Sequence, residues 1–366
     1  MKLNYEKISY QYVGIGEKQP LRQHYGLRVL PNLERISLIN IVNAEIAIRQ
    51  MCRCNKELKM ITIKNCKYTN HTEGKFPERV LRNVVICCKK LEKINLKGTP
   101  FKGRHFYMDA AALSNLRSIN LGNNPFLRTK NLYELILNCH NLEELKLSYR
   151  SAEQQLSDAD VVCLFAKLRP TLKSVTFDMA DLSDTSLAAI LACTKLEKLN
   201  LYNTSNLSSE LFVTLWRLLR HLKILKIQNA MISNEHFVRL FTDGSSSLCN
   251  LKLLNLSGSK LNSNTLETIS ECCRNLQKIV LKCCKNLETL ENFLENCPHI
   301  TSINVAFCDK ISDNELLKIP EKLSNLRTLY LDFHRRNVLE NIKNTCTHLD
   351  IFICLSEFSK NVEKLE

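Results

Sequence analysis

The sequence lacks the short motifs that mark the commonest catalytic sites. It has no Gly-x-Ser-x-Gly nucleophile turn, no glycine-rich phosphate loop and no His-Glu-x-x-His zinc motif. Its nine histidines are scattered along the chain. We therefore expect no catalytic residues, no cofactor site and a function other than catalysis.

Long apolar runs are also missing. Residues 1–20 are polar, unlike a signal peptide, and no apolar run reaches the roughly 20 residues that span a bilayer. The sequence favours a cytoplasmic or nuclear protein without a membrane span, whose 17 cysteines would be reduced thiols. Because no cysteines have the pair and histidine spacing of a zinc site, we expect no metal.

One short pattern, Leu-x-x-Leu/Ile-x-Leu with another apolar residue or cysteine at some of these positions, is present thirteen times at intervals of 23 to 33 residues. The first copy is Leu33-Glu34-Arg35-Ile36-Ser37-Leu38 and the last is Leu349-Asp350-Ile351-Phe352-Ile353-Cys354. The copies between them begin at Leu58, Leu91, Leu116, Leu142, Leu172, Leu196, Leu222, Leu251, Leu276, Ile300 and Leu326. A period in this range is typical of a leucine-rich-repeat solenoid.

Each repeat predicts a short strand followed by a helix. Residues such as Leu199-Asn200-Leu201 alternate as in a half-buried strand, and Phe237, Leu240 and Phe241 have helical spacing. The predicted fold class is α/β, a horseshoe with parallel strands on its concave face and helices on its convex face. Residues 31–355 would form this domain, between an N-terminal capping segment (1–30) and a C-terminal tail (356–366).

Serine and cysteine recur at fixed places in the repeat. Ser157, Ser183, Ser208, Ser233 and Ser312 stand where a helix should begin, and Ser312 with Glu315 matches a capping box. Cysteine recurs three residues before the first leucine, at Cys88, Cys139, Cys193, Cys273, Cys297 and Cys346. We interpret these cysteines as small buried core residues in preference to metal ligands.

This combination resembles the cysteine-containing repeats of the F-box/leucine-rich-repeat protein family. The segments Leu182-Ser183-Asp184 and Ile311-Ser312-Asp313 carry the resemblance, together with Cys193 before Leu196. It covers residues 31–354. The resemblance implies the substrate-recognition component of a cullin-type (SCF) ubiquitin ligase, which acts in ubiquitin-dependent protein degradation.

The sequence departs from that family in having no recognisable F-box, the segment that docks on the ligase adaptor subunit. A tryptophan is usual near the end of an F-box, whereas the single tryptophan here is Trp216. We therefore expect either a fragment or isoform without this segment, or a chain that works without it. The adaptor subunit stays a second candidate partner.

Positive charge is in excess, with a net charge of +14. The third, fifth and seventh positions of each pattern should face the concave side, and they hold nine cations against three anions, Glu144, Asp178 and Asp332. We expect this face to bind an acidic or phosphorylated protein. The predicted binding residues are Arg35, Lys64, Lys93, Lys97, Lys146, Lys198, Tyr202, Lys226, Lys278, Lys282 and Tyr330. The alternative is that these lysines only keep a solvated sheet soluble.

Two other functions remain open. A monomeric, stand-alone scaffold or inhibitor would bind a protein with no link to a ligase, and a basic face could bind nucleic acid nonspecifically. The few aromatic residues on the face weigh against nucleic acid. In the last repeat, Ile351, Ile353 and Leu355 should point outward, which predicts an apolar end that must be covered.

Overall fold

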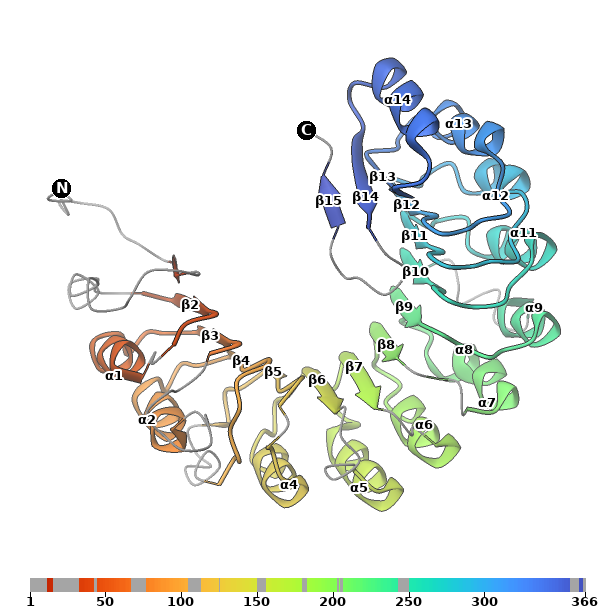
Figure 1. Ribbon diagram of the computed structural model, residues 1–366. Coiled ribbons are helices and arrows are strands. Elements are labelled where there is room, and N and C mark those ends of the chain that lie inside the picture. Colours follow the sequence, from red (N-terminus) through yellow and green to blue (C-terminus); the bar gives the residue numbers. More distant parts are fainter. Residues whose placement is uncertain are drawn as a thin grey trace, which may run out of the picture. The chain divides into compact units, whose positions relative to one another are not determined.

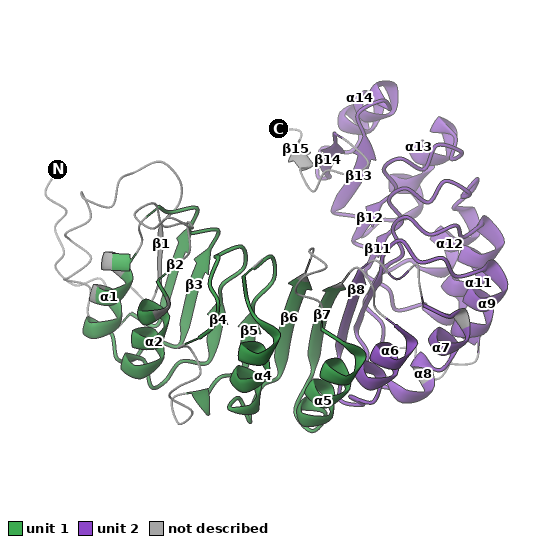
Figure 2. Cartoon of the chain, turned by 60° about the horizontal axis from the view of Figure 1, so that its bottom comes forward, with its two compact units in different colours: residues 1–180 green, residues 181–366 purple. Residues whose placement is uncertain are grey.

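The computed structural model describes residues 12–15, 33–42, 45–66, 77–104, 113–124, 126–149, 156–179, 183–202, 204, 207–242, 250–355 and 362–364. The chain forms two compact units, residues 1–180 and residues 181–366 (Figure 2). In both units strands alternate with helices along the chain (Figure 1).

The first unit is built on a parallel sheet whose strands follow one another in chain order. Its strands are β1 (Tyr12–Ile15), β2 (Arg35–Ile39), β3 (Met60–Lys64), β4 (Lys93–Asn95), β5 (Ser118–Asn120), β6 (Glu144–Tyr149) and β7 (Ser174–Met179). The described helices are α1 (Glu45–Cys54), α2 (Glu78–Cys87), α4 (Thr129–Leu137) and α5 (Asp158–Leu168).

The second unit repeats this plan from β8 to β14 and ends with an antiparallel strand, β15. Its strands are β8 (Lys198–Tyr202), β9 (Ile224–Ile227), β10 (Leu253–Asn255), β11 (Lys278–Val280), β12 (Ser302–Asn304), β13 (Thr328–Asp332), β14 (Asp350–Cys354) and β15 (Val362–Lys364). The described helices are α6 (Asp184–Leu191), α7 (Ser209–Val213), α8 (Leu215–Leu218), α9 (Asn234–Thr242), α11 (Ser263–Cys272), α12 (Glu291–Asn296), α13 (Asp313–Lys322) and α14 (Arg336–Thr345).

In each unit the helices cover one face of the sheet (Figure 1). The apolar residues of the pattern lie between helices and strands, where Leu145, Leu147, Leu254 and Leu256 are fully buried. Burial of a leucine side chain contributes about 1.5–3 kcal/mol, so each repeat is stabilised chiefly by this layer. The strands β2 to β14 match the thirteen predicted repeats, which confirms the α/β leucine-rich-repeat solenoid.

Serine side chains begin several of the helices, as predicted. The Oγ atoms of Ser183 and Ser233 accept hydrogen bonds from the backbone N–H groups three residues later. At Ser312 half of the predicted capping box is present. Its Oγ accepts from Glu315 N at 3.3 Å, but the Glu315 carboxylate binds Thr289 and Lys318 instead of the backbone before the helix. These two contacts occupy the carboxylate that a complete capping box would need.

The cysteines that precede six of the repeats are confirmed as core residues. Of the six, five are at most 2% exposed and Cys346 is half-buried. Burial raises the pKa of both Cys139 and Cys297 to about 12. These thiols are therefore protonated at neutral pH and are poor nucleophiles.

The eighth position of a repeat begins the turn after the strand, and its backbone is often left-handed. The φ angle is 55° at Asn229 and 74° at Gly258, which suits residues that adopt this conformation easily. Cys283 and Phe307 adopt it too, with φ angles of 60° and 59°. Cysteine and phenylalanine do not adopt this conformation easily, so backbone strain is concentrated in the turns after β11 and β12.

The last strand differs from the prediction by one residue. Leu329 pairs with Ile351 and Leu331 with Ile353, so Ile351 faces the helices and is only 2% exposed. The prediction that these isoleucines point outward was wrong. A one-residue shift exchanges the two faces of a strand, and here the β-branched residues take the buried side. Phe352 therefore points to the opposite face.

The predicted capping segment and tail fall largely outside the described residues. In residues 1–30 the structure describes β1, and in residues 356–366 it describes β15. The domain boundaries at residues 30 and 355 therefore stay predictions.

Candidate functional site

The face of each sheet opposite the helices, here called the open face, carries the predicted binding residues. Parallel register brings equivalent repeat positions side by side, so that Lys198 pairs with Ile224 and Lys226 with Asn255. Side chains of successive repeats therefore form rows at ~4.8 Å spacing across the strands.

In the first unit the predicted cations are spread over five repeats. Arg35 and Lys93 are exposed, whereas Lys64, Lys97 and Lys146 are half-buried. Lys146 Nζ lies 2.7 Å from Glu144 Oε1 on the same strand, which offsets its charge. The predicted residues of this unit do not gather into one cluster.

In the second unit the predicted residues lie on or just after β8, β9, β11 and β13. Lys198 and Lys226 are on neighbouring strands, and Lys278 and Lys282 flank Val280. Tyr202 OH accepts a hydrogen bond from Asn200 Nδ2 at 3.3 Å, which fixes its side chain along β8. The basic part of this open face thus runs from β8 to β11.

An aromatic cluster, defined here as Phe307, Tyr330 and Phe352, continues the open face over β12 to β14. The Tyr330 and Phe352 rings are stacked with centroids 4.7 Å apart and an interplanar angle of 14°. Lys282 Nζ lies 5.5 Å from the centroid of the Phe307 ring, within cation–π range. Phe307 is itself only 5% exposed and packs with the buried Ala306 and Cys354. Cationic and apolar surface therefore meet at Lys282.

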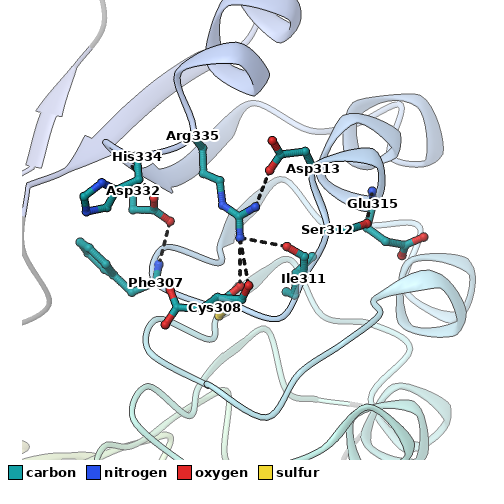
Figure 3. A network of polar contacts seen from close by, with 10 residues as sticks. Phe307, Cys308, Ile311, Ser312, Asp313, Glu315, Asp332, His334 and Arg335 are labelled. Carbon is teal, nitrogen blue, oxygen red and sulfur yellow. Dashed lines mark hydrogen bonds and ion pairs between the residues drawn. The ribbon is translucent and has the colours of Figure 1, made fainter.

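Asp332 holds the strained turn of Phe307 in place (Figure 3). Its Oδ2 accepts from Phe307 N at 3.1 Å, and its Oδ1 accepts from His334 N at 3.2 Å. Asp332 is 4% exposed, so the sequence prediction of a solvent-facing anion was wrong at this position. Its charge is used to bind backbone N–H groups of two successive turns.

Arg335 binds the loop that leads from Phe307 to α13 (Figure 3). It forms an ion pair with Asp313, and its Nη2 donates to Ile311 O at 2.9 Å and to Cys308 O at 3.5 Å. The fork-shaped guanidinium suits such multiple acceptors. Arg335 thereby joins the turn after β13 to the loop before α13.

The cluster is uncharged at neutral pH. Burial raises the pKa of the Tyr330 phenol, with smaller contributions from Cys354 and Asp350. Burial likewise raises the pKa of the Cys354 thiol, although Lys282 opposes this. Tyr330 and Phe352, which are half-buried, therefore present neutral, largely apolar groups beside the cations, whereas Phe307 is buried.

Sequence reasoning found Tyr330 and Lys282 but missed Phe307 and Phe352. Phe307 stands at an eighth position, where asparagine and glycine recur in other repeats. This departure from the pattern is the sequence signal that could have identified it. Phe352 was missed because the last repeat was placed one residue late.

The described residues contain no group of three His, Cys, Asp or Glu side chains placed to hold a metal ion. Nor is any described helix long and apolar enough to cross a membrane.

Neither a known protein family nor a curated protein sequence matches this chain. Solved structures are similar in fold. A chain of the yeast Rad7–Elc1 complex is 15% identical, covers 83% of this chain and 75% of its own, and gives a TM-score of 0.62. The leucine-rich-repeat-containing protein LegL7 from Legionella pneumophila is 16% identical over 83% of this chain and 92% of its own, with a TM-score of 0.45. An internalin from Listeria monocytogenes is 16% identical over 81% and 86%, with a TM-score of 0.42.

Proposed function

We propose that this chain is a protein-binding module whose partner lies on the open face of the second unit. The observation that carries the proposal is Phe307, an aromatic residue kept in a left-handed conformation (φ 59°) beside Lys282. Strain of this kind costs on the order of 1–3 kcal/mol and is concentrated at functional sites. Asparagine and glycine, which stand at this place in other repeats, adopt the conformation with less strain.

The chemistry of this face defines the partner. Aromatic side chains dominate the binding energy of many protein interfaces, and cations at their margin select and steer acidic partners. The partner segment would place an apolar side chain against the Tyr330–Phe352 stack and its acidic side chains near Lys278 and Lys282. The chain would work in the cytoplasm or nucleus, as a monomer and without catalysis of its own.

The finer role that we propose is substrate recognition in a cullin-type (SCF) ubiquitin ligase. Two observations support it. The repeats resemble those of F-box/leucine-rich-repeat proteins, and the chain shares its fold with a chain that was crystallised as a complex of two proteins, Rad7 and Elc1. The partner on the open face would then be the ligase substrate.

Affinity purification from cells of the source organism, followed by mass spectrometry, tests both the protein-binding role and the ligase role. We expect recovery of a cullin, its adaptor subunit and a further protein, the substrate. The double variant Lys282→Glu/Tyr330→Ala should lose the substrate and retain cullin and adaptor. The control Arg336→Glu, which reverses an exposed charge at the start of α14, should retain all three.

The outcomes separate the alternatives. Recovery of one partner without cullin or adaptor would remove the ligase role and leave a stand-alone scaffold or inhibitor. Unchanged recovery with the double variant would refute the open face as the binding site.

A further inference from the structure

A second row of side chains lies where the strands begin, at the second position of each repeat. We call it the leading edge. From Lys59 to Lys173 and from Lys223 to Arg327, each of its residues donates its backbone N–H to the carbonyl of its counterpart in the preceding repeat. Lys252 N lies 2.8 Å from Lys223 O, Gln277 N 2.9 Å from Lys252 O, and Arg327 N 2.9 Å from Thr301 O. The row therefore has the spacing of the strands themselves.

In the first unit the charges of the leading edge alternate. Its residues are Glu34, Lys59, Glu92, Arg117, Glu143 and Lys173. Lys59 Nζ lies 2.9 Å from Glu34 Oε1, and Glu143 binds both Arg117 at 2.6 Å and Lys173 at 3.1 Å. A hydrogen bond from Lys59 holds the pKa of Glu34 below its usual range. Every cation of this stretch faces a carboxylate of a neighbouring repeat.

In the second unit the alternation continues for one pair and then stops. Lys223 Nζ is 2.8 Å from Glu197 Oε2. The next residues of the row are Lys252, Gln277, Thr301 and Arg327. Among the described residues, no ion pair involves Lys252 or Arg327. Asp350, whose N–H donates to Arg327 O, belongs to the neighbouring open-face row beside Thr328.

The interrupted stretch is hollowed. A shallow hollow of about 420 Å³ is lined by Lys252, Asn275, Gln277, His299, Thr301, Asn325 and Arg327, with no carboxylate among them. The corresponding hollow in the first unit is smaller, about 240 Å³, and includes Glu92 beside its cations. The second unit thus offers cations and amides with no internal acidic partner.

We propose that the leading edge from Lys252 to Arg327 is a second docking surface, which binds an extended acidic segment of a partner protein. Lys252 and Arg327 are three strands apart, or ~14 Å at ~4.8 Å per strand. An extended chain rises ~3.3 Å per residue, so acidic side chains about four positions apart meet both cations. Asn275, Gln277 and Asn325 supply hydrogen-bonding groups for the backbone between them. This surface is separate from the open face and does not require it.

A protein segment fits this surface better than nucleic acid does. The lining contains no phenylalanine, tyrosine or tryptophan on which bases could stack. It also holds two permanent cations, which is few for a phosphate backbone whose binding depends on many charges.

The test measures the binding of a dye-labelled peptide to the full chain by fluorescence anisotropy at low salt. The peptide is 12 residues long and consists of serine with two glutamates four positions apart. Arg327→Gln should raise the Kd by about threefold to tenfold, as expected for loss of one exposed ionic contact. The matched control is Arg117→Gln, which removes the same residue type from the same row where a carboxylate already pairs with it. It should leave the Kd within about twofold. A peptide with adjacent glutamates should bind more weakly.

Three results would overturn the proposal. The first is that the peptide does not bind to the wild-type chain. The second is that the two arginine substitutions have equal effects on the Kd. The third is that a single-stranded oligonucleotide binds more tightly than the peptide and that Arg327→Gln weakens its binding. Tyr330→Ala on the open face should leave peptide binding unchanged. Failure of the leading edge is therefore distinguishable from failure of the open face.

Discussion

Tyr330 and Phe352 stack their rings 4.7 Å apart on the face of the sheet that the helices leave uncovered. Aromatic stacking of this kind usually lies inside a core, and here it joins the last two parallel strands of the second unit on the open face. Such rings supply a large, rigid contact area at low entropic cost. The stack is therefore where the proposed partner would gain most binding energy.

Tyr330→Ala should weaken partner binding by about tenfold to a hundredfold, because it removes one half of the stack. Tyr330→Phe keeps the ring and should bind within about threefold of the wild type. Isothermal titration with the recovered partner would measure both. Equal partner affinities of the Tyr330→Ala and Tyr330→Phe variants would contradict a contact at this ring.

Reversal of both open-face lysines of β11, Lys278→Glu with Lys282→Glu, should slow association and weaken binding at low salt. The attraction between these cations and an acidic partner is screened over about 10 Å at 0.1 M salt, so the difference from wild type should shrink as salt rises. Stopped-flow association rates at several salt concentrations provide the measurement. Arg336→Glu, which reverses one charge where the double variant reverses two, is the control, and a loss half as large in it would indicate a general charge effect.

Asp332→Ala should lower the free energy of unfolding by about 1–3 kcal/mol, because it leaves the buried N–H of Phe307 without its acceptor. Partner binding should fall as well, since the left-handed turn of Phe307 loses its support. Denaturant titration measures the first effect. Asp309→Ala removes an exposed carboxylate nearby and should change stability by less than about 0.5 kcal/mol.

Gly258→Ala should destabilise the second unit by about 1 kcal/mol or more. Its φ is 74°, and an added Cβ would collide with the side chain of Asn229. Gly122→Ala is the matched control, because its φ is not left-handed and its added Cβ would stay 3.4 Å from the nearest atoms. Thermal denaturation should show that the control is as stable as the wild type or slightly more stable. A larger loss at Gly122 would contradict the turn geometry.

The buried thiols should make the protein less stable at alkaline pH. Burial raises the pKa of Cys139 to about 12 from an ordinary value near 9. The unfolded chain therefore forms the thiolate first, so the contribution of this group is complete below about pH 9 and is lost as pH rises toward 12. Cys139→Ala should reduce the slope of unfolding free energy against pH in this range. Cys163→Ala, which removes an exposed thiol, should leave that slope unchanged.

The repeat period predicted the fold because each leucine row must be buried by its neighbours. Residues such as Leu254 and Leu256 are apolar for that reason alone, and their alternation can be recognised without a structure. The register of the last strand could not be predicted in the same way. Leu349, Ile351 and Ile353 are all apolar, so the pattern fits two registers, and pairing with β13 decides between them.

The candidate site was predictable only in part. Lys282 and Tyr330 follow from strand alternation, whereas the role of Asp332 depends on backbone N–H groups of two different repeats. Neither the ion pairs of the leading edge nor their interruption after Lys223 can be read from one repeat. They depend on which side chains neighbouring repeats bring together.

Site-specific photo-crosslinking tests the central claim most directly. A photoreactive phenylalanine analogue placed at Phe352, on the open face, should become covalently joined to the partner protein in cells. The same analogue at Leu218, an exposed residue of α8 on the helix side, should not. Crosslinks from position 352 alone are the result that a partner on the open face predicts. Crosslinks from position 218 alone, or equally from both positions, would contradict it.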